Sequence, residues 1–359
     1  MDYFLGGQSP SGFRTNFGRL ISDKSFYTYI LKGGAGSGKS TLMRSLAEHF
    51  DGRESIDLYR CASDLHSIDA VVLNRSKIIV VDGTAPHTFD PIYPAVCQEI
   101  VNLGEFWDSS AIAASGERII AVSDENKRLH MRSQRFVSAL SALCSDTLHI
   151  AADALNTEKL EKFSERLTKK IVGKGGHIQE GTPYFRQLSA ITQDGYVTCP
   201  PPSDYTVYIL NDAYHAGASA LLRSISEHIL RSGYNVVISE SYMFQSPQYE
   251  HILIPELKTA VMTSSSFNGF TCENKLPVNM QRFYFKQELS SRKQRISFNR
   301  RGARELGEEA ALSIAMALEI HNELEGFYSP AMNFEAIKPV SERITEAVEE
   351  RLRCNCQSR

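Results

Sequence analysis

The spacing of apolar positions changes several times along the chain, and each change predicts a different element. Aromatic and β-branched residues follow one another at 27–31, which has the length and composition of a strand. At 41–47 the apolar residues recur at helical spacing. Short apolar runs predict further strands at 56–61 and 78–81. Strands and helices that alternate in this way predict an α/β fold with mostly parallel sheets.

Two later stretches are predicted to be helical, because their apolar residues repeat every three or four positions. These stretches cover residues 129–154 and 310–324. We therefore expect each α/β core to carry a helical extension. The apolar residues on these helices are predicted to belong to the core.

The segment between the first strand and the first helix is rich in glycine and ends in lysine, serine and threonine. It consists of Gly33, Gly34, Ala35, Gly36, Ser37, Gly38, Lys39, Ser40 and Thr41. A strand, a glycine loop and a helix in this order are what a phosphate-binding loop, or Walker A motif, requires. Glycines let backbone N–H groups turn toward an anion, and the N-terminus of the next helix adds partial positive charge. The nine residues are therefore predicted to bind a nucleotide.

Three side chains of this loop have separate predicted tasks. Lys39 would reach the β- and γ-phosphates, and Ser40 would place its hydroxyl on Mg²⁺. Thr41 lies close enough in sequence to assist. All three follow directly on the last glycine of the motif.

Asp82 follows four consecutive apolar residues at 78–81. This is the pattern of a buried parallel strand that delivers a carboxylate to its C-terminal end. Asp82 is therefore the Walker B candidate, which would hold Mg²⁺ directly or through a water. The alternative is a solvent-facing carboxylate at a strand end. Its strand could lie next to the loop strand, as in kinases, or one strand away, as in many ATPases.

The candidate catalytic base is Asp64, just after the strand at 56–61, because that edge of the sheet faces the phosphates. The predicted catalytic set is thus Lys39, Asp82 and Asp64. Glu99 and Glu105, expected on a following helix, are weaker candidates for the base. His87 is close enough in sequence to sense the γ-phosphate. A structural role is equally open for Asp64 and for His87.

The second half of the chain repeats the first. Tyr208-Ile209-Leu210 falls on Tyr29-Ile30-Leu31 at a shift of 179 residues, the difference between 208 and 29. The stretch 156–168 likewise shares its pattern with 333–345. Similar shifts in separate regions predict a tandem repeat.

The glycine-rich link at 172–177 is read as the boundary between the two copies. The predicted domains are therefore 1–176, an active P-loop NTPase domain, and 177–359, a degenerate P-loop NTPase-like domain.

The second copy has lost the residues that the phosphate chemistry needs. In the aligned loop Gly33 becomes Asp212, Lys39 becomes Ala218, and Asp82 falls on Thr263. An aspartate in place of a glycine, with no lysine, has the wrong charge to hold a triphosphate. The second copy is therefore predicted to carry a pseudo-active site.

Composition sets the broad class of protein. The chain has 39 basic and 42 acidic residues, a net charge of -3, and seven cysteines, an odd number without a paired C-x₂-C framework. It shows neither a basic and apolar leader nor an apolar run of membrane-spanning length. We expect a cytoplasmic protein with no membrane partner, for which nucleic acid is an unlikely partner.

The basic run at 292–304 is expected to be a solvated helix face. An arginine that reaches into the first site and a contact with a polyanion are the alternatives.

Several P-loop subclasses are disfavoured by what the sequence lacks. It contains no [NT]-K-x-D segment after Asp82 and no D-x-x-G switch, which counts against a GTPase. Asp82 is followed by Gly83 and not by the acidic residue common in hydrolytic Walker B segments. The water-activating base must then lie elsewhere, or hydrolysis is slow.

Three strings together suggest a family. They are KGGAGSGKS at 32–40, VDGTAPH at 81–87 and NLGEFWD at 102–108. With them, the chain resembles an uncharacterised bacterial family of two-repeat P-loop ATPases over nearly its whole length. The resemblance implies ATP binding by residues 33–41 and ATPase activity.

Three functions remain open at this stage. The first is a Mg²⁺-dependent ATPase whose second copy is an inactive regulatory half. The second is a small-molecule or nucleotide kinase in which Asp64 deprotonates an acceptor hydroxyl. The third is an ATP-sensing adaptor without turnover. The sequence identifies neither a protein partner nor an oligomeric state.

Overall fold

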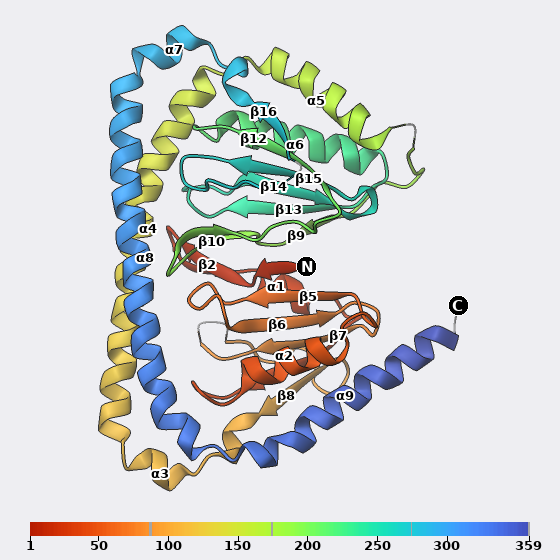
Figure 1. Cartoon of the computed structure of the whole chain (residues 1–359), viewed down its shortest axis with the longest axis vertical. Coiled ribbons are helices and arrows are strands. Elements are labelled where there is room, and N and C mark those ends of the chain that lie inside the picture. Colours follow the sequence, from red (N-terminus) through yellow and green to blue (C-terminus); the bar gives the residue numbers. More distant parts are fainter. Residues whose placement is uncertain (86–87, 174, 274, 358–359) are drawn as a thin grey trace. The chain divides into compact units, whose positions relative to one another are not determined.

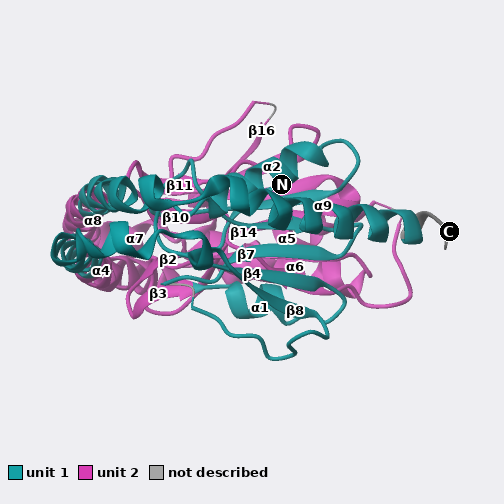
Figure 2. Cartoon of the chain, turned by 90° about the horizontal axis from the view of Figure 1, so that it is seen from below, with its two compact units in different colours: residues 1–6, 15–132, 313–359 teal, residues 7–14, 133–312 magenta. Residues whose placement is uncertain are grey.

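The computed structural model describes residues 1–85, 88–173, 175–273 and 275–357, with side chains as far as residue 354 in the last helix. The chain divides into two compact units (Figure 2). Unit 1 comprises Met1–Gly6, Thr15–Arg132 and Ser313–Arg359, and unit 2 comprises Gly7–Arg14 and Ser133–Leu312. About half of the structure is helical, and each unit contains a mixed β-sheet, so the predicted α/β class is confirmed.

Unit 1 is built on a six-stranded sheet with the order β1-β5-β6-β7-β4-β8 (Figure 1). The strands are β1 (Asp2–Phe4), β4 (Tyr27–Lys32), β5 (Ile56–Arg60), β6 (Ile68–Leu73), β7 (Ile78–Asp82) and β8 (Gln98–Asn102). Only β6 is antiparallel to its two neighbours, and the other pairs are parallel. The sheet is thus mixed, with a single reversed strand.

The helices of unit 1 cover this sheet and its carboxyl edge. They are α1 (Phe17–Ile21), α2 (Lys39–His49), the 3-10 helix η1 (Leu103–Phe106), α3 (Ser109–Ala113), the 3-10 helix η4 (Ser329–Ala331) and α9 (Phe334–Gln357). The core forms because β6 and β7 are apolar along almost their whole length and meet the apolar face of α2. That face consists of Leu42, Met43 and Leu46.

Unit 2 has a six-stranded sheet of the same design, with the order β9-β13-β14-β15-β12-β16. The strands are β9 (Pro183–Phe185), β12 (Thr206–Asn211), β13 (Val236–Ser241), β14 (Gln248–Ile254), β15 (Thr259–Ser264) and β16 (Lys275–Asn279). Here β14 is the one reversed strand. The shorter helices are α5 (Thr157–Val172), α6 (Ala216–Arg231), η2 (Pro255–Leu257), η3 (Met280–Phe283) and α7 (Lys286–Ser291).

The two sheets correspond strand for strand, which supports the repeat read from the sequence. Each copy also has a small two-stranded sheet near its start, β2 (Gly6–Ser9) with β3 (Gly12–Thr15) and β10 (Ser189–Thr192) with β11 (Gly195–Thr198). The loop strands β4 and β12 occupy the same place in the two orders. The predicted strands at 27–31, 56–61 and 78–81 are all confirmed within a residue.

Beyond the first 15 residues, the chain passes from one unit to the other inside two long helices. They are α4 (Gly116–Asp153), of 38 residues, and α8 (Lys293–Tyr328), of 36 residues. The first turns of α4 belong to unit 1 and its remainder to unit 2, whereas α8 begins in unit 2 and ends in unit 1. The predicted helical stretches lie within these helices, apart from Ala154.

As a result, the helix that ends each copy packs in the unit of the other copy. In the first copy α5 contributes Leu160 and Leu167 to the core of unit 2, beside α6. In the second copy α9 contributes Ile337, Ile344 and Val348 to the core of unit 1, beside α2. Figure 1 shows α5 next to α6 and α9 next to α2.

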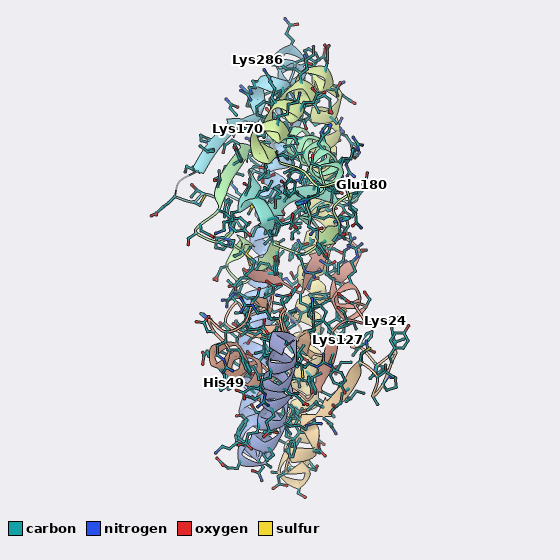
Figure 3. All side chains as sticks on the ribbon, turned by 90° about the vertical axis from the view of Figure 1, so that its right-hand side faces the viewer. Lys24, His49, Lys127, Lys170, Glu180 and Lys286 are labelled. Atoms are coloured by element: carbon teal, nitrogen blue, oxygen red, sulfur yellow. The ribbon has the colours of Figure 1, made fainter. Side chains whose placement is uncertain are left out.

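A polar contact reinforces the place of α9. His49, labelled on α2 in Figure 3, has its Nε2 3.6 Å from the carboxylate of Glu349 on α9.

The compact units therefore differ from the predicted domains 1–176 and 177–359. The predicted boundary does fall in the link between α5 and β9. However, unit 1 includes Ser313–Arg359, and unit 2 includes Gly7–Arg14 and the end of the first copy. The physical reason is the burial of the apolar faces of α5 and α9, each against the core of the other copy.

None of the helices in the described part of the chain combines the length and the apolar character that crossing a membrane needs.

Because the last helix of each copy packs in the unit of the other copy, we can predict which unit each of two matched substitutions destabilises. Ile344 on α9 and Leu167 on α5 occupy equivalent positions in the two copies and are almost fully buried. Trp107, the one tryptophan of the chain, lies in unit 1. Ile344→Ala is expected to lower the free energy of unfolding measured by Trp107 fluorescence in urea by about 2–4 kcal/mol, because it leaves a cavity in that core.

Leu167→Ala is the matched control. It should leave the midpoint of the urea transition measured by Trp107 fluorescence near its original value. It should lower the urea midpoint of the far-ultraviolet circular dichroism change that arises from unit 2. Equal shifts of the Trp107 transition in both variants, or a shift in Leu167→Ala alone, would contradict the assignment of the two helices.

Candidate functional site

The glycine-rich segment of the first copy joins the carboxyl end of β4 to the start of α2. Gly36 and Gly38 have positive φ angles of 64° and 82°, and Gly38 directly precedes α2. Residues with side chains rarely adopt this conformation, so glycine is favoured at both positions. At Gly33 the requirement is space, because a Cβ there would lie 2.6 Å from Ser37 Oγ. The result is a tight loop ahead of a helix N-terminus, a place suited to an anion.

Lys39 lies across this loop. Its Nζ donates hydrogen bonds to the carbonyl oxygens of Gly33 and Gly34, both at 2.7 Å. The same Nζ is 3.7 Å from Asp82 Oδ2, and both side chains are mostly buried. The structure thus brings together two of the three predicted catalytic residues, Lys39 and Asp82, beside the glycine loop.

Asp82 is the last residue of β7, which pairs in parallel with the loop strand β4. In that register Asp82 stands opposite Leu31, two residues before the first glycine of the loop. Its other oxygen, Oδ1, accepts a hydrogen bond from the Thr84 N–H at 2.8 Å. Of the two strand orders left open by the sequence, the structure has the strand of Asp82 next to the loop strand.

Ser40 and Thr41 occupy the first turn of α2 and point to different surroundings. Ser40 Oγ accepts a hydrogen bond of 3.0 Å from the N–H of Ile68, the first residue of β6. This bond fixes the turn before β6 against the start of α2. The side chain of Thr41 is exposed.

Asp64 lies in the turn between β5 and β6, four residues beyond the end of β5. Its carboxylate accepts hydrogen bonds from the His66 N–H and from the Ser67 hydroxyl. These bonds stabilise the turn itself, and no hydrogen bond or ion pair of the described residues joins Asp64 to Lys39 or Asp82. A catalytic role for Asp64 stays a prediction, whereas its structural role in the turn is observed.

Of the two weaker candidates for the base, Glu105 lies on a helix as expected and Glu99 does not. Glu99 is in strand β8, so its prediction on a helix is wrong, and its carboxylate pairs with Arg343 Nη1 of α9 at 2.6 Å. Glu105 lies in the short helix η1. His87 falls outside the described residues.

An aromatic wall that no sequence pattern pointed to lies against the glycine loop. A Cβ at Gly34 would be 3.3 Å from the ring of Trp107, and one at Gly38 would be 3.4 Å from Phe334. Trp107 packs against Tyr328, with ring centroids 5.3 Å apart. Trp107 belongs to the sequence NLGEFWD at 102–108. Tyr328 and Phe334 come from the second copy, almost 300 residues along the chain from the loop. No local signal could have connected them to it.

The corresponding loop of unit 2 holds an anion of its own. Asp212, fully buried, accepts hydrogen bonds from the N–H groups of Tyr214 at 3.0 Å and Ala218 at 2.8 Å. The Tyr284 hydroxyl donates to Asp212 Oδ2 at 2.8 Å and accepts from the Gly217 N–H at 2.6 Å. Burial raises the pKa of Asp212, and the surrounding donors oppose that rise. Asp212, which stands where the first copy has Gly33, thus accepts the hydrogen bonds of the loop N–H groups.

The backbone of this second loop nevertheless keeps part of the shape of the first. His215 aligns with Gly36 and has nearly the same φ, 68° against 64°. Gly217 aligns with Gly38, and a Cβ there would lie 2.8 Å from the Tyr284 hydroxyl. The helix nevertheless starts earlier in this copy, because Gly217 lies within α6 whereas Gly38 precedes α2.

Beside this loop, unit 2 has a mainly apolar pocket whose lining also includes Tyr196, His215, Ser241, Glu250 and Arg300. Glu250 is almost fully buried and accepts hydrogen bonds from the Tyr196 hydroxyl and the Asn268 amide, both at 2.9 Å. Burial raises the pKa of Glu250 to about 7. Burial also lowers the pKa of His215 to about 4. It lowers the pKa of His251, the residue after Glu250, to about 3. Near neutral pH the histidines are uncharged and Glu250 is about half protonated.

All six basic residues at 292–304 are exposed, as expected, and two of them form ion pairs within unit 2. Arg295 binds Asp146 in an ion pair, and Arg304 Nε lies 3.8 Å from Glu308. Arg300 lines the pocket beside the second loop. Residues 292–304 belong to unit 2, whereas the glycine loop belongs to unit 1.

The described residues contain no cluster of three or more His, Cys, Asp or Glu side chains that could hold a metal ion by themselves. Ser40 and Asp82 remain the oxygen donors beside the glycine loop. Such a pair suits Mg²⁺, which proteins commonly bind through one or two carboxylates together with substrate phosphates.

Comparisons of the chain with protein-family models, with curated proteins and with solved structures gave no match.

The buried carboxyl of Glu250 predicts a pH dependence of stability. Its pKa is raised from 4.5 to about 7 in the folded chain, so the native state keeps a proton that the unfolded state has lost. The stability due to this group is complete below about pH 4.5 and is lost as the pH rises through about 7. The difference in unfolding free energy between the natural chain and Glu250→Gln should therefore fall by about 2 kcal/mol between about pH 5.5 and 8.

Urea unfolding followed by circular dichroism at each pH measures this difference. The histidines contribute equally to both proteins and cancel. Glu256→Gln, at an exposed position on η2, is the matched control and should leave the pH profile unchanged. A difference between the natural chain and Glu250→Gln that is constant with pH would show that Glu250 is not protonated by burial.

Proposed function

We propose that the first copy binds ATP with Mg²⁺ through residues 33–41 and hydrolyses it slowly, as a P-loop ATPase. The observation that carries this proposal is the position of Lys39. Its ammonium lies 3.7 Å from Asp82 Oδ2, at the carboxyl ends of the adjacent parallel strands β4 and β7 and at the N-terminus of α2. Ligands of α/β sheets bind at this edge, and helix N-termini favour phosphate.

In this proposal each residue of the site has one task. The loop N–H groups and Lys39 bind the phosphates, and the hydrogen bonds of Lys39 to Gly33 and Gly34 hold its ammonium in place beforehand. Ser40 and Asp82 would hold Mg²⁺, which neutralises phosphate charge when bound. Thr84 orients the Asp82 carboxylate through its backbone N–H. Asp64 is the candidate to orient the attacking water.

The second copy would be an inactive partner in this mechanism. Asp212 occupies the loop donors, and Ala218 stands where Lys39 stands in the first copy. A triphosphate bound there would be repelled by a buried acidic side chain. It would also lack the ammonium that attracts it in the first copy. We therefore place a single ATP site in the chain.

A kinase is the second candidate, and one observation favours it. The strand that ends in Asp82 lies directly beside the loop strand, which is the arrangement that we associate with kinases. Phosphoryl transfer would use the same ATP site with an acceptor hydroxyl in place of water.

ATP binding can be measured by the fluorescence of Trp107, because its ring lies against Gly34 of the loop. Addition of ATP with Mg²⁺ is expected to change this fluorescence in a saturable way. Lys39→Ala should weaken ATP binding at least about tenfold, because it removes a charge-assisted contact to the phosphates. Lys127→Ala removes the same charge from an exposed position on α4, labelled in Figure 3, and should bind ATP as the natural chain does.

The fate of ATP separates the candidates. Release of free phosphate without any acceptor supports the ATPase, and formation of ADP only in the presence of an acceptor supports the kinase. Saturable binding without turnover indicates an ATP-sensing adaptor. An ATP affinity that is the same in Lys39→Ala and in the natural chain would refute the ATP site itself.

A further inference from the structure

The pocket of unit 2 lies at the edge of the sheet where α/β folds bind their ligands. Its lining includes Ser241 at the end of β13, Ser265 just after β15 and Ala213 in the loop after β12. These three strands run in the same direction, and the carboxyl ends of such strands form the ligand-binding edge of an open α/β sheet. The pocket encloses about 480 Å³, including the open space at its mouth, which suits a small ligand.

A phosphate group does not fit the charges at this edge. The loop N–H groups that would bind it already donate to Asp212, whose side chain is fully buried. Glu250, a second buried acidic residue, lines the pocket itself. Both carboxyl groups would repel a bound phosphate when they are ionised. The second copy thus keeps the ligand-binding edge of the fold but offers a different chemistry there.

Glu250 is a buried carboxyl group without a cation. Its oxygens accept hydrogen bonds from the Tyr196 hydroxyl and the Asn268 amide. His251 Nε2 lies 3.6 Å from Glu250 Oε2, but burial lowers the pKa of this histidine to about 3, so it is uncharged near neutral pH. A buried carboxylate is stabilised by an opposite charge, and no residue of the described chain supplies one to Glu250. The ammonium group of a ligand would supply it.

His215 is a second buried group of the pocket that lacks a partner. Its side chain is 4% exposed, and its Nε2 forms no hydrogen bond with any described residue. Burial lowers the pKa of His215 to about 4, so the ring is neutral near pH 7 and one of its nitrogens is an acceptor. Buried polar atoms in folded proteins are normally hydrogen-bonded. A ligand that donates a hydrogen bond to Nε2 would satisfy this atom.

The positive charge of the pocket is carried by an exposed side chain. Arg300 of α8 lines the pocket, and it forms no ion pair with the described residues, unlike Arg295 and Arg304 of the same basic run. A free guanidinium is well suited to bind a carboxylate through two parallel hydrogen bonds. The apolar part of the lining includes Leu143, Met243, Phe244 and Phe267. The pocket therefore combines a buried acidic group, an exposed basic group and an apolar surface.

We propose that this pocket binds an α-amino acid with an apolar side chain. The ammonium group would bind Glu250 and donate to His215, and the carboxylate would bind Arg300. The apolar side chain would pack on the apolar part of the lining. A single zwitterion thus accounts for the unpaired charges, the orphan nitrogen and the apolar lining together. The proposal goes beyond the ATP site of the first copy and does not depend on it.

The test is isothermal titration calorimetry of the full chain with leucine, methionine and phenylalanine. At least one of them should bind saturably, with one site per chain. Glu250→Gln should weaken this binding at least about tenfold and Arg300→Gln about three- to tenfold, because each removes a charge-assisted contact. Glu256→Gln and Arg301→Gln are the matched controls. Both positions are exposed and lie outside the pocket lining, so these variants should bind as the natural chain does.

Two analogues of the tightest binder assign the contacts, one without its carboxylate and one without its amino group. The analogue without the carboxylate should bind Arg300→Gln and the natural chain equally. The analogue without the amino group should bind Glu250→Gln at least as tightly as it binds the natural chain. These equalities hold only if each side chain acts on the group that the analogue lacks. They also show that the pocket of each variant is folded.

Several results would overturn the proposal. One is that the natural chain binds none of the three amino acids, and another is unchanged affinity in both Glu250→Gln and Arg300→Gln. Equal losses of affinity in the control variants would mean that the effect is one of overall charge and not of the pocket. Weaker binding of both analogues to Glu250→Gln or Arg300→Gln would show a distorted pocket in place of a specific contact, and would equally contradict the assignment.

Discussion

Backbone N–H groups in the loop before a helix have no acceptor within that helix, and each copy of this chain meets the requirement differently. In unit 2 the acceptor is Asp212, a side chain of the loop, with Tyr284 beside it. In unit 1 the aligned position is Gly33, which offers no side chain. The Asp212 carboxylate thus separates a loop whose N–H groups bond a side chain of the loop itself from one that has no side chain at that position.

The packing of α5 and α9 in the unit of the other copy explains why residues so far along the sequence lie beside the glycine loop. Because α8 ends in unit 1 and α9 packs on its core, the residues between 325 and 334 are held next to the glycine loop. Tyr328 and Phe334 form the aromatic wall from the same segment. Packing of α9 through Ile344 therefore supports the geometry of the candidate site as well as the stability of the unit.

The sequence predicted the local parts of this arrangement and missed the distant ones. The order strand, glycine loop, helix and the strand ending in Asp82 follow from short-range patterns, and all are present. Strand β6 was not predicted, because Asp69 interrupts its apolar run. Glu99 was predicted on a helix because its strand, β8, is short and partly exposed. The exchange of α5 and α9 could not be predicted, since an amphipathic helix fits either of two similar sheets equally well.

The loss of lysine and the gain of aspartate in the second loop can be understood as one change. An ammonium at position 218 beside a loop without phosphate would be a buried charge that needs a partner. Asp212 satisfies the N–H groups directly, and those groups together with the Tyr284 hydroxyl are the donors that stabilise its buried carboxylate beside a neutral alanine at 218. The second loop then becomes a rigid, self-contained turn that still keeps the positive φ at His215. In the first copy the reverse holds: Gly33 brings no side chain into the loop, and the Lys39 ammonium bonds the loop carbonyls and lies 3.7 Å from the Asp82 carboxylate.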